Sequence, residues 1–410
     1  MNNLKQVKQA TYDIVDETTR YKTLMALSDL INQNYQLIID ENQKDLALMD
    51  KNDPKYDRLE LNKDRVLAIA ADVAKVANLP FEKTQILESK LLPNGLKLKK
   101  QRVPLGVIAA IYESRPNVTV DVFSLCFRSG NACILKGGKE AHYSNLIFLS
   151  LIHNALSLHQ LNLNWVYLMS PERDAVFDLL NATDIVDVCI PRGSQQLIDF
   201  VRQNARVPVI ETGAGIVHTY FDISGDLTKG KLIINNAKTR RVSVCNALDT
   251  LIIHRERLSD LPVLVEPLVQ HKVEVFADNE SYAVLKGYYP DSLLFLAVPS
   301  DFGREFLSYK ISVKTVDTVD KAILHIRQYS SKHSEAIIAE DQDTVQYFLT
   351  RVDAAAIYAN ASTSFTDGGE FGMGAEVGIS TQKLHVRGPI GLEALTSYKW
   401  LIYGTGQIRN

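Results

Sequence analysis

The chain contains four cysteines, the residue type best suited to nucleophilic chemistry in a sequence of this kind. None of them forms a Cys-x-x-Cys pair and no histidine cluster lies beside them, so the usual zinc-site spacings are absent and no metal is expected. Three lie within apolar segments, which is typical of small buried side chains: Cys126, Cys133 and Cys189. The remaining cysteine, Cys245, is the candidate for chemistry.

Cys245 immediately precedes an apolar segment, 248–253, that is typical of a strand, and it follows three basic residues: Lys238, Arg240 and Arg241. Nearby positive charge lowers the pKa of a thiol and increases the fraction of thiolate, which is the nucleophilic form. Closeness in sequence does not establish that these charges point at the sulfur, so a purely structural role for Cys245 also stays open.

Alternating strands and helices are expected to position this chemistry. Before them, the first eighty residues have apolar residues at helical spacing, with a break at Asp53-Pro54. The strands that we expect cover 107–112, 132–135, 165–168, 185–190 and 207–210. The helices between them cover 118–126, with Gly130 at its end, then 146–156, the region of Ala175, and 195–204. This alternation predicts an α/β fold with a doubly wound, mainly parallel sheet.

Polar turns follow four of these strands, at the sheet edge where ligands of such folds bind. They contain Asn117, Lys136, Ser194 and Glu211. Gly193-Ser194 opens a helix, whose free N–H groups favour an anion such as a cofactor phosphate. The common nucleotide fingerprints are missing, which argues against an ordinary Rossmann dehydrogenase or a P-loop kinase.

Composition excludes other classes of function. The chain has 410 residues and a formal net charge of −3, without the strongly basic balance of a nucleic-acid partner. No stretch approaches the ~18 apolar residues of a membrane span, and the N-terminus has no apolar signal-peptide core. We therefore expect a cytoplasmic protein whose partners are neither membranes nor nucleic acids.

A second α/β lobe should follow from about residue 248, and the partly apolar tail is compatible with either an interface or core packing.

Several short motifs together resemble the gamma-glutamyl phosphate reductase family. They lie at 104–107, 112–119, 129–132, 136–140, 236–239, 244–247 and 333–337, with the longest match between 360 and 400. The resemblance implies an aldehyde dehydrogenase-like fold. An NADP-binding domain would cover 1–222, with candidate oligomerisation strands at 88–102. A catalytic domain would cover 223–388, and 389–410 would form an oligomerisation segment.

The resemblance also implies roles for individual residues. Cys245 corresponds to the family nucleophile and Asn117 to the asparagine that stabilises the oxyanion. The candidate cofactor-binding residues are Lys136, Gly193, Ser194, Glu211, Glu305 and Phe306. Glu211 falls where relatives that hydrolyse their thioester keep a general base. Because hydrolysis would waste the intermediate, Glu211 could contact cofactor or orient other groups, and a purely structural role also stays open.

The activity implied is the NADPH-dependent reduction of L-glutamyl 5-phosphate to L-glutamate 5-semialdehyde through a Cys245 thioester, in proline synthesis. Arg115, Lys383 and Arg387 are candidates to bind the anionic groups of this substrate, because arginine presents a fork suited to carboxylate and phosphate. A homo-oligomer is expected, and association with a glutamate 5-kinase is a further hypothesis.

Some positions depart from the usual pattern of relatives. Val242 replaces a proline, Ser330-Ser331-Lys332 replaces Gly-Ser-Gly, and Thr212 and Ala214 replace a histidine and an aspartate. Three alternatives stay open: another oxidoreductase of the aldehyde dehydrogenase superfamily, a kinase or nucleotide-binding module, and a non-catalytic scaffold.

Overall fold

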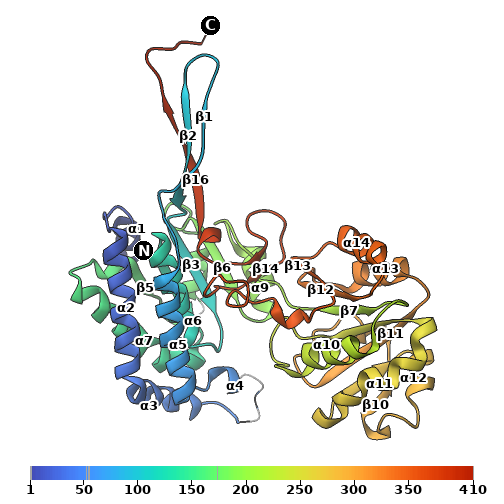
Figure 1. The fold of residues 1–410 in the computed structure, drawn as a ribbon. Coiled ribbons are helices and arrows are strands. Elements are labelled where there is room, and N and C mark those ends of the chain that lie inside the picture. Colours follow the sequence, from blue (N-terminus) through green and yellow to red (C-terminus); the bar gives the residue numbers. More distant parts are fainter. Residues whose placement is uncertain (1, 52, 54–55, 173, 410) are drawn as a thin grey trace. The chain divides into compact units, whose positions relative to one another are not determined.

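The computed structural model describes residues 2–51, 53, 56–172 and 174–409 (Figure 1). The chain forms two compact units. The first unit contains 1–212, 372–378 and 389–410, and the second contains 213–371 and 379–388. Assignment of these stretches to cofactor binding and catalysis stays a prediction. Pro54, at the predicted helix break, lies outside the described residues.

The N-terminal segment is helical, as predicted. Its helices are α1 (Asn2–Ala10), α2 (Glu17–Gln33), α3 (Tyr35–Leu46), α4 (Tyr56–Leu59) and α5 (Lys63–Asn78). Helix α2 begins after Asp16, whose side chain accepts a hydrogen bond from the backbone N–H of Thr19 at 2.8 Å. Such caps satisfy a backbone donor that the first helical turn leaves unpaired. Leu24 and Leu27 of this helix are fully buried, so the helices form part of the core of the first unit.

A four-stranded parallel sheet lies at the centre of the first unit. Its strand order is β5 (Val166–Leu168), β4 (Ala132–Gly137), β3 (Val107–Tyr112) and β6 (Val188–Arg192). The connecting helices are α6 (Asn117–Ser129), α7 (His142–Leu158), α8 (Asp174–Leu180) and α9 (Gln195–Asn204). Every residue of β3 and β4 is buried, as expected for strands covered on both faces. The arrangement confirms the predicted doubly wound α/β class.

Two of the expected strands differ from the structure. The segment expected at 185–190 begins only at Val188, because the backbone N–H groups of Ile185 and Val186 both donate to Ala182 O in a turn. The strand expected at 207–210 is wrong: Val209 forms only an isolated bridge with Cys189. Pro208 has no N–H to donate, which limits how far a strand can pair at this position.

A three-stranded antiparallel sheet extends from the same unit (Figure 1). It contains β1 (Ile86–Leu91), β2 (Lys97–Pro104) and β16 (Thr396–Tyr403), in the order β1-β2-β16. Large apolar side chains of β16 are exposed, with Trp400 at 41% and Ile402 at 60%. This exposure does not fit the core-packing alternative for the tail. Whether the strands join protomers stays a prediction.

The second unit is built on a seven-stranded parallel sheet. Its order is β10 (Leu294–Leu296), β9 (Glu274–Ala277), β11 (Lys310–Val316), β8 (Thr250–His254), β7 (His218–Phe221), β12 (Ser334–Ile338) and β13 (Ala356–Ala359). The helices are α10 (Leu227–Thr239), α11 (Leu261–Val265), α12 (Asn279–Leu285), α13 (Val319–Tyr329) and α14 (Gln342–Arg351). The predicted second α/β lobe is therefore present, and its first expected strand corresponds to β8. The lobe begins earlier than the expected residue 248, because the second unit starts at Gly213 and its sheet includes β7.

Short elements complete the connections. Strands β14 (Ile379–Ser380) and β15 (Gly388–Pro389) form a two-stranded sheet. The 3₁₀ helices are η1 (Lys139–Ala141), η2 (Leu163–Trp165), η3 (Arg255–Asp260), η4 (Glu266–His271), η5 (Asp291–Leu293), η6 (Pro299–Asp301), η7 (Thr363–Phe365) and η8 (Glu393–Leu395). Among the described helices, none combines the length and apolar character needed to span a membrane.

Candidate active site

The turn that precedes Asn117 is held by a side chain from the neighbouring strand connection. Ser114 has a left-handed backbone with φ of 46°, a conformation that non-glycine residues rarely adopt. Its backbone N–H and its hydroxyl both donate to Glu140 Oε1, at 2.7 and 2.8 Å. These two bonds fix the turn between β3 and α6, and they place Asn117 at the first position of α6.

The first turn of α6 is also held by hydrogen bonds of the buried Thr119 side chain. Thr119 Oγ1 donates to Asn145 Oδ1 at 2.8 Å and lies 2.7 Å from Tyr112 Oη. Because a threonine hydroxyl has a single proton, Tyr112 is the donor in the second contact. All three side chains are buried, and burial raises the pKa of Tyr112 well above its ordinary value. The helix that carries Asn117 therefore begins in a defined position.

Asn117 makes a contact that the sequence analysis missed. Its Nδ2 donates to Asp121 Oδ2 at 2.8 Å, one helical turn later. Burial raises the pKa of Asp121 to about 7. The i,i+4 spacing of an amide and a carboxylate was the available signal for this pair.

A pocket of about 770 Å³ lies at the carboxyl ends of the strands in the first unit. It contains two of the predicted cofactor residues, Lys136 and Ser194, and its lining also includes Glu113, Lys139 and Glu140. The predicted residues are thus brought together by β4 and β6, although they are far apart in sequence. A cavity of this size with a few polar groups is suited to a small ligand or part of a cofactor.

Lys136 reaches this pocket from the end of β4 and is almost fully buried. Its Nζ donates to Pro171 O at 2.8 Å and to Gly137 O at 3.3 Å. Burial lowers the pKa of Lys136. The two carbonyls fix the direction of the ammonium group, which still has a third proton to donate.

At the start of α9, an acidic side chain lies where the sequence predicts an anion. Ser194 caps the helix, and its backbone N–H donates to Glu113 Oε2 at 3.0 Å. A Cβ on Gly193 would lie 2.7 Å from the same carboxylate oxygen, so glycine permits this close approach. The positive end of the helix favours negative charge. Glu113 was missed by the sequence analysis because its position becomes apparent only when β3 and β6 pair.

Glu211 follows α9 and comes two residues after Val209, which bridges to Cys189 of β6, and it is half-buried. One of its oxygens is 3.6 Å from Arg202 Nη1 on α9. The neighbouring Thr212 is buried and donates to Pro191 O at 2.6 Å. The ion pair with Arg202 fixes the carboxylate of Glu211, and the functional role of Glu211 stays a prediction.

In the second unit, Cys245 lies in the turn between α10 and β8 and is half-buried. The following residue, Asn246, is buried and fixes this turn: its Nδ2 donates to Ser364 O and Thr366 O at 3.3 and 3.0 Å. Thr363 Oγ1 donates to Asn246 O at 2.8 Å. The other three cysteines are fully buried, which confirms them as packed apolar side chains.

Gly215 packs directly against the turn that contains Cys245. A Cβ at this position would lie 1.6 Å from Cys245 O, which no side chain can satisfy. The N–H of Gly215 donates to Glu305 Oε1 at 2.8 Å. Phe306 N donates to Asp249 Oδ1 at 2.9 Å, and its ring stacks on Phe276. The structure thus connects the predicted Glu305-Phe306 pair to the cysteine turn.

The basic residues that precede Cys245 are arranged differently from one another. Lys238 is fully buried, and its Nζ donates to Leu248 O at 2.8 Å. Burial lowers the pKa of Lys238 and raises that of its buried neighbour Asp249, while the attraction between the two charges opposes both changes. Arg240 and Arg241 are exposed. The charge of Lys238 is therefore partly balanced by Asp249.

Two of the predicted substrate residues meet at one carboxylate. Asp353 is 2.8 Å from Arg387 Nη1 and 3.1 Å from Lys383 Nζ. The hydrogen bond from Arg387, followed by that from Lys383, holds the pKa of Asp353 below its ordinary value. Arg115, the third candidate, is half-buried in the turn before Asn117.

Lys332, which replaces a glycine of the usual pattern, adopts a left-handed backbone with φ of 65°, the conformation for which glycine is best suited.

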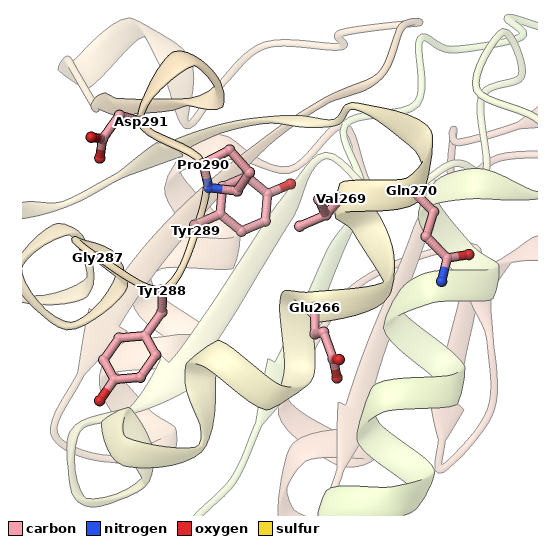
Figure 2. Close-up of a pocket in the computed structure, with 8 residues that line it drawn as sticks. All are labelled: Glu266, Val269, Gln270, Gly287, Tyr288, Tyr289, Pro290 and Asp291. Carbon is pink, nitrogen blue, oxygen red and sulfur yellow. The ribbon is translucent and has the colours of Figure 1, made fainter.

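A further pocket of about 630 Å³ lies in the second unit, between η4 and the connection that follows α12 (Figure 2). Its lining includes Glu266, Tyr288 and Asp291. None of the residues predicted for catalysis, cofactor or substrate is among the described residues that line it.

Comparison with known proteins gives a consistent result over the whole chain. No protein-family model matches. The chain is 63% identical over 411 residues to a gamma-glutamyl phosphate reductase of Legionella pneumophila (strain Corby), covering 100% of this chain and 99% of the relative. It also matches the crystal structure of gamma-glutamyl phosphate reductase from Thermotoga maritima, with a TM-score of 0.93, 37% identity, and coverage of 100% of this chain and 99% of that one.

More distant structures have the same fold. An acetylating aldehyde dehydrogenase from Geobacillus thermoglucosidasius is 15% identical, with a TM-score of 0.74, and covers 100% of this chain and 97% of that one. At this identity the similarity concerns the fold alone. It confirms the expectation of an aldehyde dehydrogenase-like architecture.

Proposed function

Because this chain belongs to the gamma-glutamyl phosphate reductase family, a family of oxidoreductases, we propose that it reduces L-glutamyl 5-phosphate to L-glutamate 5-semialdehyde and phosphate. This is a step of proline synthesis. The observation that carries the proposal is the 63% identity to a curated reductase along essentially the full length of both chains.

Cys245 is the proposed nucleophile. Its thiolate attacks the acyl carbon, phosphate leaves with the electron pair of the C–O bond, and a thioester forms. Its half-buried position in a turn held by Asn246 supports this role, because a nucleophile needs both access and a fixed position. Phosphate is a good leaving group, so the reaction needs no strong general acid.

Asn117 is the proposed donor to the oxyanion that develops on the acyl oxygen, together with a backbone N–H near Cys245. Removal of one such donor typically costs ~10²–10³ in rate. The anchoring of the first turn of α6 by Thr119 and Asn145 supports this role, because a donor contributes most when its position is fixed before the reaction.

NADPH is the proposed cofactor, and it would supply the hydride that reduces the thioester. The pocket in the first unit supports its binding: Lys136 and Ser194 lie there, and Lys139 adds a second positive charge suited to a 2′-phosphate. Gly193 would allow close approach of the phosphates to the start of α9, and Glu305 and Phe306 would contact the nicotinamide ribose. Binding at the start of α9 requires Glu113 to share or release Ser194 N, with which it now bonds.

Lys383 and Arg387, with Arg115, are proposed to bind the phosphate and the α-carboxylate of the substrate. Their support is chemical: two cations converge on Asp353, and an incoming anion would compete with that carboxylate. Glu211 is proposed to orient neighbouring groups, because a hydrolytic base would destroy the thioester before reduction.

The remaining proposals concern assembly and location. The exposed apolar face of β16 supports a homo-oligomer, since such side chains are usually covered by a partner. Transfer of the labile acyl phosphate from an associated glutamate 5-kinase, and a cytoplasmic location, stay predictions.

The reverse reaction tests the proposal, because glutamyl phosphate is unstable. The enzyme would receive the cyclised semialdehyde, NADP and phosphate, and reduced cofactor would be followed by absorbance. Phosphate-dependent reduction of NADP is the expected result. Turnover without phosphate would instead indicate a hydrolytic aldehyde dehydrogenase, and absence of turnover under all conditions would favour a non-catalytic scaffold.

A further inference from the structure

The contact between Asn117 and Asp121 constrains which end of the amide faces the carboxylate. An ionised carboxylate is only an acceptor, so it holds Asn117 Nδ2 and repels Oδ1. Since Nδ2 has two protons, one is used by Asp121 and the other is directed elsewhere. The same contact therefore both orients the amide and leaves one donor available.

Two other pairs of a side-chain amide and a carboxylate in this chain have the same i,i+4 spacing, but they lie on solvent-exposed helix faces. Gln36 donates to Asp40 on α3 at 2.9 Å, and Gln195 donates to Asp199 on α9 at 3.0 Å. Both pairs are exposed. Such i,i+4 pairs add only slightly to the stability of a helix.

Asp121 is in a different environment from those two aspartates. Burial raises its pKa to about 7, and negative charge from Asp72 on α5 and Glu376 before β14 acts in the same direction. The positive charge of Arg192, at the end of β6, opposes these effects. A carboxylate in this environment costs stability that a helix-stabilising pair would not recover.

We propose that Asp121 is the positioning residue of the active site: its carboxylate fixes the Asn117 amide so that the second N–H of Nδ2 donates to the acyl oxygen of the substrate. This inference rests on the proposed function, in which Asn117 stabilises the oxyanion. Asp121 itself does not touch substrate and acts only through Asn117. No bond is made or broken at Asp121 in the reaction.

A double-mutant cycle on the full-length enzyme tests this dependence. The variants are Asn117→Ala, Asp121→Ala and the double variant, with kcat measured in the reverse assay. Asp121→Ala is expected to lower kcat by about 10- to 100-fold, the scale of a misplaced catalytic group. In the Asn117→Ala background the same change should lower kcat by less than about twofold, because the amide through which it acts is already gone. The Michaelis constant for NADP should change little.

The matched control is Asp40→Ala, which removes the acceptor of the equivalent exposed pair on α3 and should leave kcat unchanged. An equal loss of kcat from Asp121→Ala in both backgrounds would overturn the inference, because the carboxylate would then act independently of Asn117. If the wild-type enzyme shows no phosphate-dependent turnover, the proposed function fails, and a cofactor-free assay then decides the positioning role.

A cofactor-free measurement distinguishes failure of the proposed reductase activity from failure of the positioning role of Asp121. Hydrolysis of p-nitrophenyl acetate, followed as release of p-nitrophenolate, reports attack by the thiolate and stabilisation of the oxyanion without NADP or phosphate. The same non-additive pattern in this assay would support the positioning role even if the natural acyl substrate is another one. Additive losses here would contradict it regardless of the reductase result.

Discussion

The carboxylate of Glu305 accepts a hydrogen bond from the N–H of Gly215 at 2.8 Å, and it thereby holds the glycine on which the Cys245 turn packs. Glu305 is separated from Gly215 by some 90 positions in the sequence. The contact joins a residue expected to bind cofactor to the segment expected to carry the nucleophile, all within the second unit.

Substitution of Gly215 by alanine should therefore lower activity strongly. The new Cβ would lie 1.6 Å from Cys245 O, so the turn must shift. We expect kcat to fall by about 100-fold or more, since a displacement of about 1 Å has that effect on a catalytic group. Reverse-assay kinetics on the purified variant measure this loss.

Gly287→Ala is the control for a general effect of glycine replacement. Gly287 has φ of 86° but nothing within 4 Å of an added Cβ. It should lose ~1 kcal/mol of stability from backbone strain and keep full kcat. If Gly215→Ala retained wild-type kcat, the packing of this glycine against the cysteine turn would not matter for catalysis.

The pH dependence of stability should contain a contribution from Asp121. Its pKa is about 7 in the folded chain, compared with an ordinary value of 3.8. The folded state therefore binds the proton more tightly, so this contribution is fully present below pH 4 and is lost as the pH rises through 7. Relative to wild type, Asp121→Asn should gain on the order of 2–3 kcal/mol between pH 5 and pH 8.

Urea unfolding at the two pH values measures this difference. The variant should be more stable than wild type at pH 8 while its kcat is lower, a combination expected of a group retained for function. A variant that loses stability at pH 8 would show that the carboxylate serves the fold instead.

Arg387→Ala should weaken binding of the anionic substrates. Loss of a charge-assisted bond is worth ~1.5–3 kcal/mol, so the Michaelis constant for phosphate in the reverse reaction should rise about 10- to 100-fold. The constant for NADP should be nearly unchanged. Lys321→Ala, at an exposed lysine on α13, is the matched control. Equal increases for phosphate and NADP would argue against a substrate role for Arg387.

Lys139→Ala should reduce the preference for NADPH. The lysine is exposed at the rim of the pocket in the first unit, and its partner Glu172 at 3.1 Å is also exposed. We expect kcat/KM to fall about tenfold with NADP and to stay close to wild type with NAD, since only NADP has the 2′-phosphate. Parallel losses for both cofactors would place the recognition of that phosphate elsewhere.

Continuous apolar segments made parts of the fold predictable. The strand 107–112 was expected at its observed bounds because six buried residues in a row have no polar interruption. The helix 195–204 was likewise expected, because Ser194 is a clear cap. The segment 207–210 has the apolar character of a strand, but Pro208 removes the donor needed for continued pairing. The apolar pattern alone does not reveal that this backbone N–H donor is missing.

The site was predictable only where a residue type carries its own chemistry. The three cysteines expected to be buried are buried and Cys245 is half-buried, but its role as the nucleophile stays a prediction. Glu113 and Asp353 were missed, because each acquires its partners through pairing or packing of segments distant in sequence. Asp121 was missed for another reason: its spacing from Asn117 was visible, but its burial was not.

The most direct test of the central claim compares two cysteine variants in the reverse assay. Cys245→Ala and Cys189→Ala would each be supplied with the cyclised semialdehyde, NADP and phosphate. Cys189 is fully buried in β6, so its variant should keep phosphate-dependent turnover, whereas Cys245→Ala should lose it. Phosphate-dependent turnover that persists in Cys245→Ala would contradict a thioester at this residue.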